Sequence, residues 1–244
     1  RQDEVQLRGH AIEVRLCAES PTDDFLPGSG TIVDWSPPAG VRCDHALRAG
    51  AEAPAWYDSM VAKLIAHAPT REQCIDQLAA AVDRTVLLGL QSNRAFLGRL
   101  LRHESFRAGF DVSTAFIERH FGAAEARQPQ PDAKLWALAA WISVAGAPEA
   151  ECTTAAWRNW STSRPLPQPW RLHWHAPAAL AGATTEMRGR VYLTPCSARV
   201  EHPAGQVQLQ AVPVTTGVQA KAIIDGEHVD YRYAWSGATL WLHT

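Results

Sequence analysis

The sequence has no long apolar run and no strong charge of either sign. No stretch approaches the ~18–20 apolar residues that span a bilayer, and the N-terminus lacks the basic, apolar and small-residue order of a signal peptide. With 23 Lys and Arg against 25 Asp and Glu, the net charge is −2. This balance gives no reason to expect nucleic acid or an anionic membrane as a partner. We expect a cytoplasmic protein.

Cysteine is sparse, and no two cysteines form a C-x-x-C pair. The five cysteines are odd in number and widely spaced, which predicts reduced thiols. Histidines are scattered, and the H-x-x-E formed by His10 and Glu13 has no second ligand pair at a useful spacing. We therefore expect no metal held by protein side chains alone.

The chain also lacks the common signatures of a complete catalytic site. There is no G-x-S-x-G elbow, no Walker-type phosphate loop and no G-x-G-x-x-G. The nearest glycine cluster, Pro27-Gly28-Ser29-Gly30, fits a turn. Composition and spacing alone indicate a folded two-domain protein, since 46% of its 244 residues are hydrophobic.

The domain boundary is predicted at residues 122–131, where GAAEARQPQP carries two prolines and no large apolar side chain. Before it, residues 11–16 alternate as a strand, residues 31–35 and 41–45 form two more, and Thr70 caps a helix that begins near Arg71. Asn93 or Ser92 caps a second helix, whose apolar face holds Phe96, Leu97, Leu100 and Leu101. The first half is thus an antiparallel sheet with helices, of the α+β class.

The second half begins with a helix at 132–145, capped by Asp132, with one apolar face of Leu135, Leu138, Ala139 and Ile142. Strands follow, with a hairpin turn at Asp225-Gly226. Alternation of Val229, Tyr231, Tyr233 and Trp235 behind that turn favours an antiparallel β-barrel-like domain, which we expect to be incomplete at Thr244. Eight of the ten tryptophans lie in this half, and some of this aromatic surface is expected to face a partner.

Arg15 is the residue best suited to bind a substrate. The strand alternation places it on the face opposite Ile12 and Val14, and a guanidinium gives parallel hydrogen bonds to a planar anion at any working pH. The alternative is a surface arginine paired with Glu13, Glu19 or Asp58. The residues alone leave both readings open.

Three segments resemble the C-terminal domain of biotin carboxylases. The first is Arg8-Gly9-His10-Ala11-Ile12-Glu13-Val14-Arg15-Leu16-Cys17-Ala18-Glu19, continued by Phe25-Leu26-Pro27 and Gly30. The others are Tyr57-Asp58-Ser59-Met60-Val61-Ala62-Lys63-Leu64-Ile65 and Leu88-Gly89-Leu90-Gln91-Ser92-Asn93. The resemblance covers residues 1–121 and implies an ATP-driven ligase that carboxylates biotin on a carrier domain with bicarbonate.

The resemblance implies that Arg15 is catalytic and binds bicarbonate and biotin, stabilising charge on the ureido oxygen. Asp58 and Lys63 are expected to support the pocket or to pack the sheet. The ATP-grasp residues that bind ATP and Mg or Mn in this family lie upstream of the matching motif, so we expect this chain alone to be inactive. Pro37-Pro38-Ala39-Gly40-Val41-Arg42 is two residues shorter than the family pattern in a dimer-contact segment, which puts that dimer contact in doubt.

Residues 132–244 resemble, by the order of their elements, the coupling domain in α subunits of methylcrotonyl-, geranyl- or propionyl-CoA carboxylases. This implies a carboxyltransferase β subunit and a biotin carboxyl carrier domain as partners; the acyl-CoA cannot be read here. The alternative is a non-enzymatic module that docks the β subunit. Pyruvate carboxylase would require a barrel of alternating strands and helices after residue 122, which the strand-rich pattern disfavours.

Overall fold

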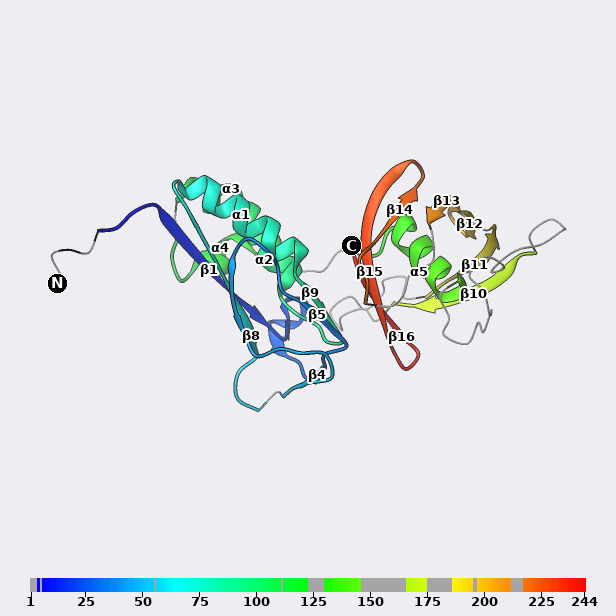
Figure 1. The fold of residues 1–244 in the computed structure, drawn as a ribbon, viewed down its shortest axis with the longest axis horizontal. Coiled ribbons are helices and arrows are strands. Elements are labelled where there is room, and N and C mark those ends of the chain that lie inside the picture. Colours follow the sequence, from blue (N-terminus) through cyan, green and yellow to red (C-terminus); the bar gives the residue numbers. More distant parts are fainter. Residues whose placement is uncertain are drawn as a thin grey trace. The chain divides into compact units, whose positions relative to one another are not determined.

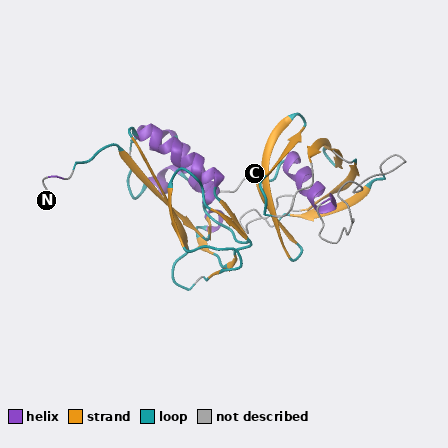
Figure 2. Cartoon of the chain, in the orientation of Figure 1, coloured by secondary structure: helices purple, strands orange, loops and turns teal. Residues whose placement is uncertain are grey.

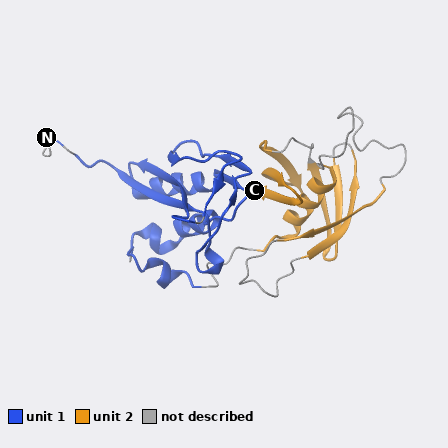
Figure 3. Ribbon diagram, turned by 90° about the horizontal axis from the view of Figure 1, so that it is seen from below, with its two compact units in different colours: residues 1–128, 177–179 blue, residues 129–176, 180–244 orange. Residues whose placement is uncertain are grey.

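The computed structural model describes residues 4, 6–54, 56–110, 112–122, 130–145, 166–174, 186–194, 197–211 and 217–244. They fall into two compact units, residues 1–128 with 177–179 and residues 129–176 with 180–244 (Figure 3). Each unit has a hydrophobic core of its own. Most of the linker predicted at 122–131 lies outside the described residues, and the domain bounds stay a prediction.

A three-stranded antiparallel sheet, in the order β1-β8-β6, organises the first unit. β1 (His10–Cys17) pairs with β8 (Met60–Ala68), which pairs with β6 (Arg42–His45). The predicted strand at 31–35 is wrong, because Thr31 belongs to one short pair and Asp34 to another. These two pairs are β4 (Gly30–Thr31) with β7 (Glu52–Ala53), and β5 (Asp34–Ser36) with β9 (Val86–Leu88). A third short pair joins β2 (Glu19–Ser20) to β3 (Leu26–Pro27).

Helix α1 (Arg71–Arg84) covers one face of this sheet and buries Ile75, Leu78 and Val82 in the core (Figure 1). It begins where predicted, because the Thr70 hydroxyl accepts a hydrogen bond from the Gln73 backbone N–H. The sheet's other face stays open to solvent along Arg15 and Arg42. Four short helical segments follow the chain around this core: η2 (Pro21–Asp23), α2 (Arg94–Arg102), α3 (Glu104–Ala108) and α4 (Phe116–His120).

The second unit is a seven-stranded antiparallel sheet in chain order that curls around one helix (Figure 2). Asp225 and Gly226 both adopt positive φ, 49° and 86°, as the predicted two-residue hairpin requires. The strands are β10 (Gln168–His173), β11 (Glu186–Leu193), β12 (Ser197–His202), β13 (Gly205–Ala211), β14 (Ala220–Ile224), β15 (Glu227–Ser236) and β16 (Thr239–His243).

The enclosed helix is α5 (Ala133–Ala145), and Asp132 caps it by accepting from the Leu135 N–H at 2.8 Å. The prediction of a single apolar face is wrong. Trp136, Ala137, Ala140 and Trp141 are buried together with Leu138 and Ile142, so the helix is buried nearly all round. A helix surrounded by a curled sheet has no solvent face, which is why its sequence is apolar on every side.

The alternating aromatic residues of β15 face this core. Tyr231 and Tyr233 are buried and stacked, Tyr231 also meets Trp141 edge to face, and Trp235 packs at the margin. The Tyr231 hydroxyl has no hydrogen-bond partner among the residues that the structure describes, and burial raises its pKa to about 12. These side chains fill the unit, and the expectation that some of the aromatic surface faces a partner stays a prediction. Trp157 and Trp160 lie outside the described residues.

No helix in the described parts of the chain is long and apolar enough to cross a membrane.

Candidate anion site on the first sheet

Arg15 stands on the open face of β1. Its neighbours Val14 and Leu16 are 7% and 0% exposed, whereas the Arg15 side chain is 69% exposed. The predicted orientation of Arg15, away from the core, is therefore observed. Its catalytic role stays a prediction.

One carboxylate lies between Arg15 and Lys63. The two cations are direct cross-strand partners, and Arg15 Nε and Lys63 Nζ each lie 3.8 Å from Glu13 Oε1. Exposed pairs at this separation contribute little. No terminal nitrogen of Arg15 donates a hydrogen bond to a described residue, so the guanidinium fork is available to an anion.

An ion pair within β6, between Arg42 and Asp44, keeps the local charge positive. Asp44 lies opposite Lys63 but accepts both of its close hydrogen bonds from Arg42, at 2.9 and 2.8 Å. Those bonds hold the pKa of Asp44 below its usual value. Three cations therefore share this face with two carboxylates, which favours a small anion beside Arg15.

Asp58 has a local role in the structure. It is exposed, and its Oδ1 accepts a hydrogen bond from the Met60 N–H at 2.9 Å at the start of β8. No hydrogen bond or ion pair joins Asp58 to Arg15 or Lys63 within the described residues. Asp58 thus shapes the entry to the strand that carries Lys63.

Glu19 joins the three sequence segments that carry the family resemblance, although it was not among the residues assigned to the site. Its Oε1 accepts from Asn93 Nδ2 at 3.0 Å and its Oε2 from Ser59 Oγ at 3.2 Å. The local sequence around Glu19 does not reveal these two hydrogen bonds, because Ser59 and Asn93 lie 40 and 74 positions away along the chain.

Burial is the largest influence on the pKa values of Glu19 and Cys17. It raises the pKa of Glu19, against the lowering effect of the hydrogen bonds from Ser59 and Asn93. Burial also raises the pKa of the Cys17 thiol, and the Glu19 charge adds to that rise. Cys17 therefore stays a neutral thiol at physiological pH and is not an activated nucleophile.

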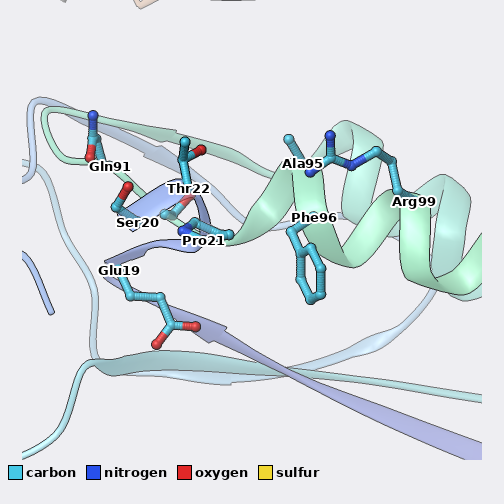
Figure 4. Close-up of a pocket in the computed structure, with 9 residues that line it drawn as sticks. Glu19, Ser20, Pro21, Thr22, Gln91, Ala95, Phe96 and Arg99 are labelled. Carbon is cyan, nitrogen blue, oxygen red and sulfur yellow. The ribbon is translucent and has the colours of Figure 1, made fainter. Parts of the chain in front are cut away.

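Two hollows in the described part of this unit do not include Arg15 in their lining. One is lined by Glu19 at one end and Arg99 at the other, with Phe96 projecting between them (Figure 4). A second lies beside Trp56. Arg15, Asp58 and Lys63 line neither, so this chain presents Arg15 on an open surface.

The described residues do not fit a metal ion. They contain no group of three or more His, Cys, Asp or Glu side chains placed to hold one.

The fold and the exposed arginine define a mixed α and β domain whose antiparallel sheet presents a cationic face. Residues 13–119 match the family model of the biotin carboxylase C-terminal domain. This part of the chain is therefore similar to that domain.

Two curated relatives support the assignment. The α subunit of mitochondrial methylcrotonoyl-CoA carboxylase from Dictyostelium discoideum is 40% identical over 143 residues, 57% of this chain and 20% of that protein. Biotin carboxylase 1 of Bacillus subtilis (strain 168) is 38% identical over 122 residues, 49% of this chain and 27% of that protein. The chain thus spans about a fifth to a quarter of the length of these relatives.

A solved structure agrees. The biotin carboxylase subunit of pyruvate carboxylase superposes with a TM-score of 0.50 at 31% identity, over 53% of this chain and 29% of that one.

Proposed function

We propose that this chain is part of the α subunit of a biotin-dependent acyl-CoA carboxylase and that Arg15 serves its biotin carboxylase reaction. In that reaction ATP phosphorylates bicarbonate to carboxyphosphate with release of ADP, and the carboxyl group passes to N1 of carrier-bound biotin with release of phosphate. The observation that carries the proposal is an exposed arginine on a family-matched strand, whose terminal nitrogens donate no hydrogen bond to a described residue.

The role of Arg15 follows from its chemistry. Its fork donates parallel hydrogen bonds to two oxygens of bicarbonate, and the same donors stabilise negative charge as it develops on the ureido oxygen of biotin. Lys63 adds a second positive charge from the neighbouring strand, and the Glu13 carboxylate lies 3.8 Å from both cations. ATP and Mg or Mn are assigned to residues outside this chain, and the chain alone is expected to be inactive.

Residues 132–244 are proposed as the coupling domain that contacts a carboxyltransferase β subunit. A helix enclosed by a curled antiparallel sheet supports this, since it is the order of elements that the resemblance implies. The Dictyostelium α-subunit alignment of 143 residues also exceeds the 128 residues that precede the unit boundary. The acyl-CoA type stays open between methylcrotonyl, geranyl and propionyl, and the cytoplasm is the proposed location.

The test joins the full chain to the N-terminal part of Bacillus subtilis biotin carboxylase 1, in place of the matching segment, and measures ATP hydrolysis that requires both bicarbonate and biotin. Activity is expected, and Arg15→Ala should lower it about 10²–10³-fold. Arg48→Ala, which removes an exposed loop arginine of the same unit, is the control and should retain activity.

A folded, inactive fusion protein, or equal activity in the Arg15 and Arg48 variants, would refute the enzymatic proposal. Co-purification of the chain with a β subunit in that case would favour the alternative, a docking module without a catalytic role.

A further inference from the structure

Asn93 occupies the N-cap of α2 but does not cap it. Its side chain makes no hydrogen bond to the first turn of the helix, although asparagine is among the strongest capping residues. The residue is only 5% exposed, so its buried amide group is expected to find hydrogen-bond partners within the protein. The helix begins after Asn93, one of the two residues predicted to cap it, but the Asn93 side chain makes no capping bond and is directed elsewhere.

The amide group pairs with the edge of β1 beside Arg15. Asn93 Oδ1 accepts from the Cys17 N–H at 3.0 Å, and Nδ2 donates to the Arg15 carbonyl at 3.1 Å. The Asn93 backbone N–H donates to the Cys17 carbonyl at 3.1 Å. Together these bonds imitate the pairing of an additional strand along residues 15–17.

This stretch of β1 needs such support. β1 is an outer strand of the described sheet, with β8 on one side only. The β1–β8 register shifts between Leu16 and Cys17, so the regular ladder is interrupted one residue after Arg15. Without Asn93, the carbonyl of Arg15 and the N–H of Cys17 would lose their partners on the free side.

We call the three bonds of Asn93 to Arg15 and Cys17 the Asn93 anchor, and a further bond extends this anchor beyond β1. Asn93 Nδ2 also donates to Glu19 Oε1 at 3.0 Å, and Ser59 Oγ donates to Glu19 Oε2 at 3.2 Å. Ser59 directly precedes β8, the strand that carries Lys63. The same amide group therefore ties the backbone of Arg15 to the segment that leads into β8.

We propose that Asn93 is a positioning residue for Arg15, which fixes the backbone from which the guanidinium reaches bicarbonate. The inference rests on the proposed function for its chemistry, but the anchor itself is a property of this chain. A displaced arginine weakens bicarbonate binding and carboxyl transfer, whereas ATP binding by the remainder of the enzyme is unaffected.

The experiment uses Asn93→Ala, which removes all three side-chain bonds, and Asn93→Asp, which keeps the acceptor for Cys17 but loses both donor bonds. The control is Thr85→Val, because Thr85, the C-cap residue of α1, is also buried, and among the described residues its hydroxyl donates only to the Ala81 carbonyl, at 2.8 Å. All are compared in the fusion protein described above and in the chain itself.

In the fusion protein, both Asn93 variants should raise the KM for bicarbonate about tenfold or more and leave the KM for ATP unchanged. Thr85→Val should change neither KM, since a purely structural defect reduces only the amount of active protein. Unchanged KM for bicarbonate in both Asn93 variants, while Arg15→Ala is severely impaired, overturns the inference and leaves the proposed function intact.

In the 244-residue chain, amide exchange and ¹⁵N relaxation report on the anchor without any activity. Asn93→Ala should accelerate exchange of the Cys17 amide at least about tenfold and lower the backbone order parameters of residues 15–17, and Thr85→Val should do neither. Residues 15–17 that stay equally ordered and protected in Asn93→Ala overturn the inference, whether or not the fusion protein is active.

Discussion

Glu19 shows how a single buried charge contributes to stability at the residue scale. A raised carboxyl pKa means that the folded state holds the proton more tightly than the unfolded chain. The stabilisation from this group is therefore present at low pH and is lost as the pH rises from the ordinary value of 4.5 through the raised value. At neutral pH the ionised carboxylate is held in place by Ser59 and Asn93 at the expense of its hydration.

We predict that Glu19→Gln removes this pH dependence. The neutral amide keeps the shape and still accepts from Asn93, so the melting temperature of the variant should rise relative to the parent between about pH 4 and about pH 7. Thermal unfolding of both proteins across that range measures the difference, and Glu52→Gln, at an exposed carboxylate, serves as the control. A constant difference between the Glu19 variant and the parent would contradict the burial argument.

At the scale of elements, β11 depends on one glycine. Gly189 pairs directly with Trp170 of β10, and a Cβ at this position would collide with the Glu201 carbonyl of β12 and lie 3.0 Å from Trp170 Nε1. A backbone carbonyl in a paired strand cannot move aside as a flexible side chain does. The close approach allows the sheet to curl at this point while the indole lies over the glycine.

Gly189→Ala should therefore destabilise the second unit by about 2–3 kcal/mol or more. Gly28→Ala is the matched control, because a Cβ there meets only the Ala18 carbonyl, at an ordinary 3.9 Å. Chemical denaturation followed by tryptophan fluorescence compares the variants. Equal stability of the two alanine variants would show that β11 and β12 separate without loss of packing.

At the scale of the whole molecule, two cores share no residue. One is built around Leu78 of α1 and the β1–β8 pair, and the other around Ile142 of α5. Leu78 and Ile142 are each at most 1% exposed, so replacing either one leaves a cavity only in the core to which it belongs.

Leu78→Ala and Ile142→Ala should each destabilise their own unit by about 2–5 kcal/mol and leave the other unit's protection unchanged. Hydrogen exchange measured by mass spectrometry separates the two, with peptides from β8 reporting on the first core and peptides from β15 on the second. Simultaneous loss of protection in both units from either substitution would show that the chain unfolds as one cooperative body.

The sequence by itself determined several local elements and the resemblance of residues 1–121 to a family. The alternation at residues 11–16 placed Arg15 opposite the core, Thr70 and Asp132 marked helix starts, and Asp225-Gly226 marked a hairpin, because each depends on residues within a few positions of one another. The motifs around Arg15 and Asn93 identified the biotin carboxylase C-terminal domain.

Only the tertiary structure decided which polar groups act together. The direction of the Asn93 side chain, its bonds to residues 15–17 and the bridging role of Glu19 all depend on contacts between residues 40 to 78 positions apart. The burial of α5 on every side and the inward face of β15 likewise follow from the curl of the second sheet. Periodicity specifies which side chains share a face, but the face that meets solvent is set by what packs against it.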